Sequence, residues 1–590
     1  MMRARVASLC VIAACGPSDD QTKGLVAIEV QPANATVTYD SGVTMPVDYI
    51  AVGHYKDGRT QTLTDVEWSL DTSAMALGSL NIAEFTASGA AAGTGTVSAA
   101  LGPATGATGV SVIVHQLHVD PNSPPGSEND FPDNPPVGAL SPAIDYPLDG
   151  AVMPSTAKAP DVQWEGAGNA GDLYRVRMVG GLATVDTILA VAPGFRFESL
   201  PSASDWQLLV ASTAGLPISV AVDHWDAATG AQRGGPVQVK AVPADVTGAI
   251  YYWNLSQGKM ERIDDAGRAL AIPNPPASPG DANNHCVACH VVSRDGRYLA
   301  GELWGGGDKG AAFDLSDPAV RAGNPAPTLA PLTPTSYQSL FSTFSPDASR
   351  LLINFGTQFQ LIDPRTGATV PTAGVPLPAA NAAHPCWSPD GTAIAYAANI
   401  LYNGGQAPWA VDYTSGDLQL IPVTGPDTFG APVSLVPSAS VDPAFAAPSW
   451  PSFAPDSTWI AFGAGVNSRG RNNINGTETT FPGSLFLIGR NGGTPIRLDT
   501  ACGGARNCFL PNFSPYDAGG YYWLVFYSLR DYGNAIAGTK GTTRRQMWVT
   551  AIDKSKLGTG DASAVPYWIP DQDAQTENMS AFWSVPPPLQ

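Results

Sequence analysis

The stretch CWSPDGTAIAYAA, residues 386–398, decides how the larger part of this 590-residue chain is interpreted. It sets an apolar residue before a Ser-Pro-Asp-Gly turn and an apolar run after that turn. Proline presets the φ angle of one turn position, and Asp and Gly suit the positions that follow. We therefore expect a β-hairpin built on this turn.

The same pattern occurs four more times, so the hairpin is the unit of an internal repeat. Each copy is followed by a further strand that ends in a polar turn, and Asp295, Asp347, Asp390 and Asp456 are most simply turn formers. The last copy has Tyr516 where Asp is usual and a longer turn, DAGGYY. The other copies are VVSRDGRYLAG (291–301), TFSPDASRLLINF (343–355), SFAPDSTWIAFGA (452–464) and NFSPYDAGGYYWLVFYS (512–528).

Two leftover segments complete the repeat. IYYWNLSQG (250–258) is a strand without a hairpin before it, and SAFWSVPP (580–587) starts a hairpin with nothing after it. Joined, they make a sixth unit from both ends and remove exposed strand edges. Residues 246–590 resemble the blades of TolB-type propellers, which implies a six-bladed β-propeller with a channel face that docks peptides.

The composition agrees with an all-β chain. It contains 62 Gly and 53 Pro, and only 14% of its residues are charged. The formal net charge of −20 argues against nucleic-acid binding, because that binding needs Lys and Arg on phosphates. We expect two β-sandwich domains followed by the six-bladed β-propeller.

The region before the repeat divides into three segments. Residues 25–116, with a hairpin signal at Asp57-Gly58, resemble bacterial Ig-like domains of the adhesin (Big) type. Residues 117–142 are rich in proline and predict an extended linker. Residues 143–243 resemble a fibronectin type III sandwich, which implies that Trp164 and Tyr174 pack between its sheets.

The first 15 residues carry an export signal. Two arginines precede a short apolar run that ends at Cys15, and the run is too short to span a bilayer. Residues 12–15, IAAC, resemble the lipobox of bacterial lipoproteins. The resemblance implies lipid on Cys15 and, with Gly16 rather than Asp next, the outer membrane, with the protein periplasmic or surface-exposed. An uncleaved anchor is the alternative.

Cys286-Val-Ala-Cys289-His290 has the spacing that attaches a c-type haem. The two thiols would bond to the haem vinyl groups, and His290 would be the axial ligand of the iron. A usual cytochrome c continues into a helix after the His, whereas this chain continues into a hairpin. The alternative is therefore a Cys286–Cys289 disulfide, with His290 on the surface.

The register of the repeat adds a second histidine. Cys289 lies six residues before Asp295, and His384 lies six residues before Asp390. If the units are equivalent, both positions lie where an innermost strand begins, close to the axis. His384 is thus the possible distal ligand, ahead of His285 and Met579; alternatively, it only lines the channel.

The remaining cysteines and missing motifs limit the function. Cys502 and Cys508 flank the Gly-rich loop GGARN, and export permits a disulfide between them, while Cys386 is left as an odd thiol. No P-loop, G-x-S-x-G or H-E-x-x-H motif is present, so no sequence motif supports an enzymatic function. Two hypotheses remain: a haem c redox module with an unknown envelope partner, or a haem-free scaffold that binds protein or glycan.

Overall fold

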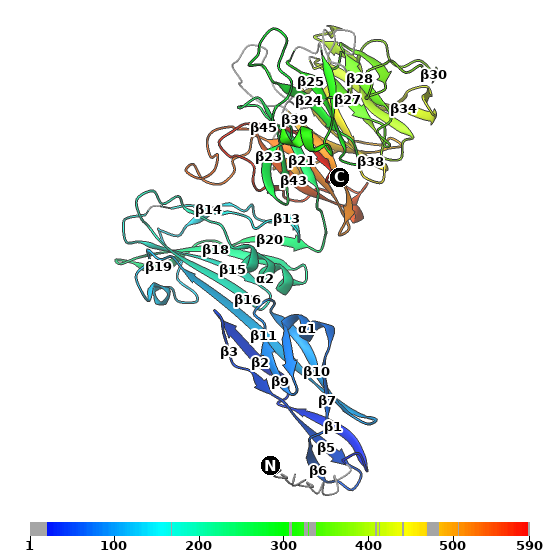
Figure 1. Ribbon diagram of the computed structural model, residues 1–590. Helices are drawn as coiled ribbons and strands as arrows, with labels where there is room; N and C mark the ends of the chain where they lie inside the picture. Colours follow the sequence, from blue (N-terminus) through cyan, green and yellow to red (C-terminus); the bar gives the residue numbers. More distant parts are fainter. Residues whose placement is uncertain are drawn as a thin grey trace, which may run out of the picture. The chain divides into compact units, whose positions relative to one another are not determined.

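The chain folds into two compact units that are built mainly of β-strands (Figure 1). The first unit contains residues 1–117, 181–185 and 207–212, and the second contains residues 118–180, 186–206 and 213–590. The predicted all-β class is confirmed. The computed structural model describes residues 21–166, 168–305, 309–323, 328–329, 338–407, 410–411, 413–438, 442–468, 483–504 and 507–587.

The first unit holds the predicted hairpin at Asp57-Gly58. It joins β5 (Ile50–Tyr55) to β6 (Thr60–Leu63), and Gly58 takes a φ of 84° that other residues avoid. Its buried apolar core includes Val37, Phe85 and Val112. Its other elements are β1 (Leu25–Gln31), β2 (Ala35–Asp40), β3 (Val43–Thr44), β4 (Val47–Asp48), β7 (Glu67–Leu70), α1 (Thr72–Leu77), β8 (Gly78–Asn81), β9 (Glu84–Ala87), β10 (Gly93–Leu101) and β11 (Ala104–Val119).

The predicted second sandwich packs its aromatic residues between two sheets. Trp164 on β14 (Val162–Glu165) and Tyr174 on β15 (Leu173–Gly180) are both buried, with ring centroids 5.3 Å apart. This contact confirms the core role expected for them. The other elements are β12 (Ala143–Tyr146), β13 (Ala151–Pro154), β16 (Ala183–Ala190), β17 (Glu198–Ser199), α2 (Ala203–Thr213), β18 (Pro217–Asp226), β19 (Gly230–Arg233) and β20 (Val237–Val242).

The Pro-rich segment is attached to this sandwich. After η1 (Ser127–Asp130), Phe131 is buried, and the Arg175 guanidinium donates to the carbonyls of Phe131 and Pro132 at 3.1 and 3.0 Å. Arg175 also pairs with Asp223 in the sandwich. The linker is therefore held at Phe131 and Pro132 by a buried charge, which its proline content alone does not predict.

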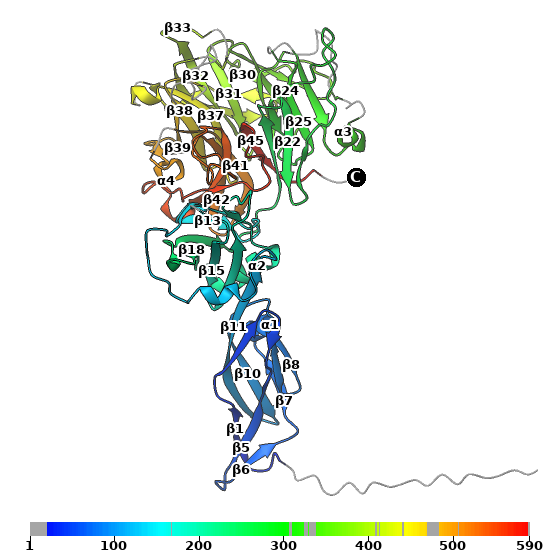
Figure 2. The same ribbon diagram turned by 90° about the vertical axis from the view of Figure 1, so that its left-hand side faces the viewer.

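Residues 249–584, where the structure describes them, form six separate sheets; Figures 1 and 2 together label a strand of each. Their strands are, sheet by sheet, β21 (Ala249–Asn254), β22 (Lys259–Asp264), β23 (Gly267–Leu270) and β45 (Asn578–Ser584); β24 (Val287–Val292), β25 (Tyr298–Leu303) and β26 (Gly310–Asp314); β27 (Phe341–Phe344), β28 (Leu351–Phe355) and β29 (Gln358–Ile362); β30 (Ala373–Gly374), β31 (Ala382–Trp387), β32 (Ala393–Tyr402), β33 (Gly405–Gln406), β34 (Ser415–Gly425), β35 (Thr428–Phe429) and β36 (Val433–Val436); β37 (Ala447–Phe453), β38 (Trp459–Gly465), β39 (Gly483–Gly489) and β40 (Ile496–Arg497); β41 (Cys508–Ala518), β42 (Tyr521–Ser528), β43 (Gln546–Asp553) and β44 (Tyr567–Trp568). Short helices α3 (Pro318–Ala322), η3 (Pro443–Phe445), α4 (Asp499–Cys502) and η4 (Lys554–Lys556) lie between them.

The five predicted hairpins are the antiparallel pairs β24–β25, β27–β28, β31–β32, β37–β38 and β41–β42. The predicted sixth unit also forms, because β45 pairs with β21 in an antiparallel register. We call the strand that opens each hairpin the first strand of its sheet; these are β24, β27, β31, β37 and β41, and β45 is the first strand of the sheet that contains β21. Each first strand contacts the next in this order, and β45 contacts β24 again. The fifth hairpin departs from the repeat: its turn lies at Gly519-Gly520, both with positive φ, rather than at Ser514-Pro515.

The residue pattern that the repeated turns share has a local cause. The carboxylate of Asp390 accepts hydrogen bonds from the Ser388 hydroxyl at 2.6 Å and from the Thr392 backbone N–H at 2.9 Å. Asp295, Asp347 and Asp456 each accept from the backbone N–H two residues later in the same way. The four aspartates are therefore turn formers, as the sequence predicts.

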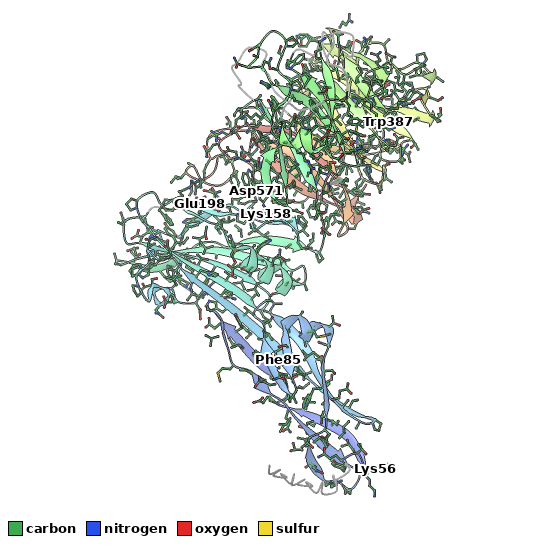
Figure 3. All side chains as sticks on the ribbon, in the orientation of Figure 1. Lys56, Phe85, Lys158, Glu198, Trp387 and Asp571 are labelled. Carbon is green, nitrogen blue, oxygen red and sulfur yellow. A yellow bond between two sulfur atoms is a disulfide. The ribbon has the colours of Figure 1, made fainter. Side chains whose placement is uncertain are left out.

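Within the second unit, the sandwich is joined to the six sheets through buried polar contacts. The Asn534 side chain donates to the carbonyls of Arg196 and Phe197 at 3.0 and 2.9 Å and accepts from the N–H groups of Ile536 and Ala537. A separate contact between these parts is the ion pair of Lys158 with Asp571 (Figure 3).

We expect Asn534→Ala to lower the free energy of unfolding of the second unit by about 2 kcal/mol, because it removes a buried side chain and leaves the partly buried backbone groups that it contacts without this partner. Calorimetry of the full chain measures the loss. The exposed Asn122→Ala is the control and should change stability by less than about 0.5 kcal/mol. Equal losses in the two variants would contradict the role given to Asn534.

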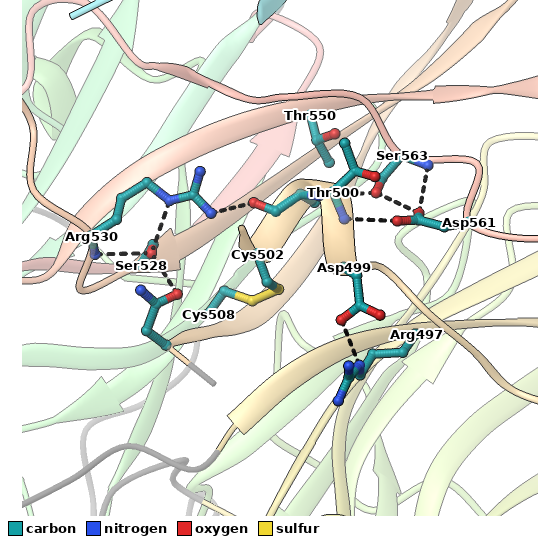
Figure 4. The surroundings of a disulfide bond; sticks show 12 residues. Arg497, Asp499, Thr500, Cys502, Cys508, Ser528, Arg530, Thr550, Asp561 and Ser563 are labelled. Atoms are coloured by element: carbon teal, nitrogen blue, oxygen red, sulfur yellow. Dashed lines mark hydrogen bonds and ion pairs between the residues drawn. A yellow bond between two sulfur atoms is a disulfide. The ribbon is translucent and has the colours of Figure 1, made fainter. Parts of the chain in front are cut away.

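The predicted disulfide between Cys502 and Cys508 is present. It joins the end of α4 to the start of β41 with a Cα–Cα distance of 5.7 Å, and both residues are buried (Figure 4). Polar contacts hold α4, on the Cys502 side: the Arg530 guanidinium donates to the Ala501 carbonyl, and the Thr500 N–H donates to Asp561 at 2.7 Å. The disulfide therefore fixes the position at which the chain enters β41.

The double variant Cys502→Ala, Cys508→Ala should lose about 2 kcal/mol of unfolding free energy, because the short loop closed by the bond gains freedom in the unfolded chain. Urea denaturation with and without a reducing agent measures this. The parent should lose stability on reduction, and the variant should not respond. A variant that still responds to the reductant would show that another disulfide carries the effect.

Candidate functional site

A cavity of about 500 Å³ lies among the first strands of the six sheets. Every one of these strands contributes to its lining, together with Trp253 of β21 and Tyr527 of β42. The lining is largely apolar and aromatic. A few polar side chains also reach it, and these include Cys289, His290, Arg294 and His384.

A β-bulge aims one residue of most of these strands into the cavity. In β24, β31, β37, β41 and β45, two residues lie opposite one on the partner strand. The first residue of each bulge has positive φ, and we call these five the bulge residues: Cys289 (47°), His384 (50°), Trp450 (55°), Leu510 (53°) and Ser580 (55°). In β27, which has no bulge, Phe341 occupies the same register and also lines the cavity.

The bulges confirm the register inferred from the sequence. Cys289 and His384 both lie six residues before their turn aspartates, and both occupy bulge positions of strands that line one cavity. A left-handed backbone costs a residue other than Gly about 1 kcal/mol. The fold tolerates this cost at each of the five positions, as is common where side chains are positioned for function.

His384 is held rigidly. Its ring stacks on Trp450 with centroids 3.7 Å apart, its Nδ1 lies 3.1 Å from the Tyr413 hydroxyl, and only 3% of the residue is exposed. Burial lowers the pKa of His384 to about 3, so the ring is neutral at physiological pH. Its Nε2 is buried and has no hydrogen-bond partner among the described residues.

His290 faces the same cavity from β24. Its Nε2 lies 3.3 Å from the Tyr251 carbonyl, and burial lowers the pKa of His290 to about 4. Its Nδ1 is buried without a partner in the described part of the chain. Each of the two neutral imidazoles thus carries one ring nitrogen with unused hydrogen-bonding capacity.

The two cysteines of the motif open on different cavities. Cys289 lines the central cavity, whereas Cys286 lines a neighbouring one formed by residues 257–260, 272–275 and 283–287. Burial, with a contribution from Glu302, raises the pKa of Cys286 to about 11. Both residues are thiols here, so the Cys286–Cys289 disulfide that was the alternative does not form.

The residues fit a haem in part. Cys289, His290 and His384 share one cavity, and the unused imidazole nitrogens are the donor type that haem iron takes. Cys286 does not fit, since its thiol would have to move into the central cavity to form a second thioether. His285 is a poor ligand, because both of its nitrogens lie near the carbonyls of Pro275 and Ala282. Over the described ranges, no three His, Cys, Asp or Glu residues gather as a metal site.

Cys386 has a structural role that the sequence did not indicate. Its thiol donates to the Trp387 carbonyl, with sulfur and oxygen 3.8 Å apart, and the backbone N–H of Phe453 in the next sheet acts on the sulfur and lowers the thiol pKa, against the burial that raises it to about 11. The neighbouring sheets use the same link: Thr343 accepts from Trp387 N–H, Ser452 from Phe513 N–H and Asn512 from Trp583 N–H, at 2.8 to 2.9 Å. Four small polar side chains therefore join consecutive sheets. In the sequence, each of them lies three residues before the turn proline of its repeat, and this spacing could have identified them.

Cys386→Ser should keep this link and change the unfolding free energy by less than about 0.5 kcal/mol, because Ser452 already serves in the next sheet. Cys386→Ala should lose about 1 kcal/mol, since the Phe453 N–H would remain buried without an acceptor. Chemical denaturation of both variants measures the difference. Equal stability of the two would overturn the link.

Cys15 and the export signal predicted before it lie outside the described residues. No helix in the part of the chain that the structure describes is long and apolar enough to cross a membrane.

Comparison with known proteins gives no family. No protein-family model and no curated protein matches the chain. A nidogen/laminin complex structure is similar over 57% of this chain and 98% of its own, at 9% identity and a TM-score of 0.34. A eukaryotic initiation factor covers 79% of this chain and 95% of its own at 11% identity and TM-score 0.26. An ancestral GH74 enzyme covers 62% and 36% at 8% identity and TM-score 0.24. With TM-scores this low, none of these likenesses bears on function.

Proposed function

We propose that the six sheets are the blades of a six-bladed β-propeller of TolB type, carried behind an Ig-like and a fibronectin III-like sandwich. Three observations support this: the cyclic contacts of the first strands, the pairing of β45 with β21, and the shared lining of one cavity. A propeller protects its strand edges by such repetition.

We further propose that the protein is an outer-membrane lipoprotein, anchored through lipid on Cys15, that binds one haem c and transfers electrons to an envelope partner. The observation that carries the haem is the meeting of Cys289, His290 and His384 on one cavity, with an unused nitrogen on each imidazole. An unpaired buried polar atom is costly, and a ligand that uses it repays that cost.

The cavity's own residues suit this group. His290 and His384 would hold the iron through their imidazoles, and a haem held in this way would supply one-electron transfer. The aromatic side chains of the cavity would shield it from water, and Cys289 would supply one thiol. Arg294 lines the same cavity with a guanidinium that donates to the Pro455 carbonyl at 3.3 Å, and burial lowers its pKa. A half-buried cation of this kind would complement the carboxylates of a haem.

The position of Cys286 favours a second candidate function. Because its thiol opens on the neighbouring cavity, the central cavity could serve without haem, as an apolar pocket on the channel face that binds protein or glycan. Aromatic side chains such as Trp253, Phe341 and Trp450 suit either ligand. The two functions differ in iron content.

The deciding experiment expresses the full chain in a periplasm with the cytochrome c maturation machinery. The parent should show covalent haem by haem staining and by its pyridine haemochrome spectrum, and the double variant Cys286→Ala, Cys289→Ala should show none. Intact mass spectrometry counts one haem and also reports lipid on Cys15. The matched control is Cys386→Ser, which removes a thiol without touching the motif and should retain haem.

A parent without haem under these conditions would overturn the redox function and leave the binding scaffold. Haem that survives in the double variant would show attachment elsewhere and equally contradict the site.

A further inference from the structure

Tyr413 makes the contact that fixes the chemistry of His384. Its hydroxyl lies 2.8 Å from the Pro448 carbonyl, 2.8 Å from Ser449 Oγ and 3.1 Å from His384 Nδ1. All three neighbours are buried with it. A tyrosine hydroxyl has one hydrogen to donate, so only one of these contacts can use it.

The Pro448 carbonyl decides where the hydrogens go. It can only accept, so the Tyr413 hydroxyl donates its one hydrogen to this carbonyl. Ser449 Oγ, 2.8 Å from the Tyr413 oxygen, must then donate to that oxygen. Because the Tyr413 oxygen can only accept from its remaining neighbour, His384 Nδ1 is the donor in their contact. The neutral ring therefore carries its hydrogen on Nδ1, and Nε2 holds a lone pair.

A second set of contacts fixes Tyr413 itself. Its backbone N–H donates to Ser468 Oγ at 3.2 Å, and its carbonyl accepts from Ser468 N–H at 2.9 Å. The Trp450 indole, which stacks on His384, donates to the Ser468 carbonyl at 3.0 Å. Ring plane and tautomer of His384 are thus held by one connected network.

We propose that Tyr413 is a positioning residue that keeps His384 in the Nδ1–H tautomer, so that Nε2 is presented as the sixth ligand of the haem iron. Histidines that bind metals commonly donate their other ring N–H to a neighbour, which orients the ring and raises its basicity. Here the neighbour is a buried tyrosine. The inference rests on the proposed haem in the central cavity, but the tautomer does not require it.

The first test uses the haem-free double variant Cys286→Ala, Cys289→Ala with ¹⁵N-labelled histidine rings. NMR of the ring nitrogens should show His384, assigned by its loss in His384→Gln, with hydrogen on Nδ1. Tyr413→Phe should abolish this preference. The control Tyr396→Phe removes another buried hydroxyl, which contacts Gln419 at 3.0 Å, and should leave His384 unchanged. Hydrogen on Nε2 in the unsubstituted background would overturn the proposal, even if Tyr413→Phe failed to fold.

The second test uses the haem-loaded chain. The parent should give the absorption spectrum of low-spin iron, and Tyr413→Phe should let added imidazole displace His384 at about tenfold lower concentration, in line with the effect of other such partners. Low-spin iron that survives in His384→Gln would overturn the ligand role of His384. A parent without haem would contradict the proposed function alone, because the NMR test still reads the tautomer.

Discussion

In five first strands of the described sheets, a bulge puts two residues opposite one and turns the backbone of the first to positive φ. The extra residue increases the local twist and re-aims a side chain. Without it, the strict alternation of a strand would direct only every second side chain to the cavity. The cavity lining therefore depends on a backbone irregularity that recurs from sheet to sheet. The side chain at each bulge position determines which chemical group faces the cavity.

The links between sheets follow from the same geometry. A backbone N–H of the next sheet is reached by Cys386, Ser452 and Asn512, each two residues after a bulge residue, and by Thr343, two residues after Phe341 in β27, which has no bulge. Strand edges that face another sheet in a repeat must find such partners, because a buried N–H is rarely left unpaired. Cys386 is thus a hydrogen-bond acceptor in a row of small polar residues. Its raised thiol pKa keeps it protonated at neutral pH and makes it a poor nucleophile.

What the sequence predicted was local or repeated. The hairpins, the turn aspartates, the Cys502–Cys508 bond and the common register of Cys289 and His384 all depend on short spacings, which the fold preserves. Contacts between distant segments were not predictable: the packing of Phe131 beneath Arg175, and the Asn534 contacts across the second unit. The turn of the fifth hairpin lies at Gly519-Gly520 and not at Ser514-Pro515. The glycines accept positive φ readily, whereas Ser514-Pro515-Tyr516 lacks the aspartate that closes the other turns.

The separation of Cys286 from Cys289 has a cause in the strand. β24 begins at Val287, so Cys286 lies just before it, where its carbonyl accepts from Trp304 N–H at 2.9 Å. The thiol is thereby left on the side of residues 272–275, while the bulge carries Cys289 to the other side. A second thioether, to Cys286, would require its thiol to leave the side of residues 272–275, whereas Cys289 already lines the central cavity together with His290 and, from β31, His384.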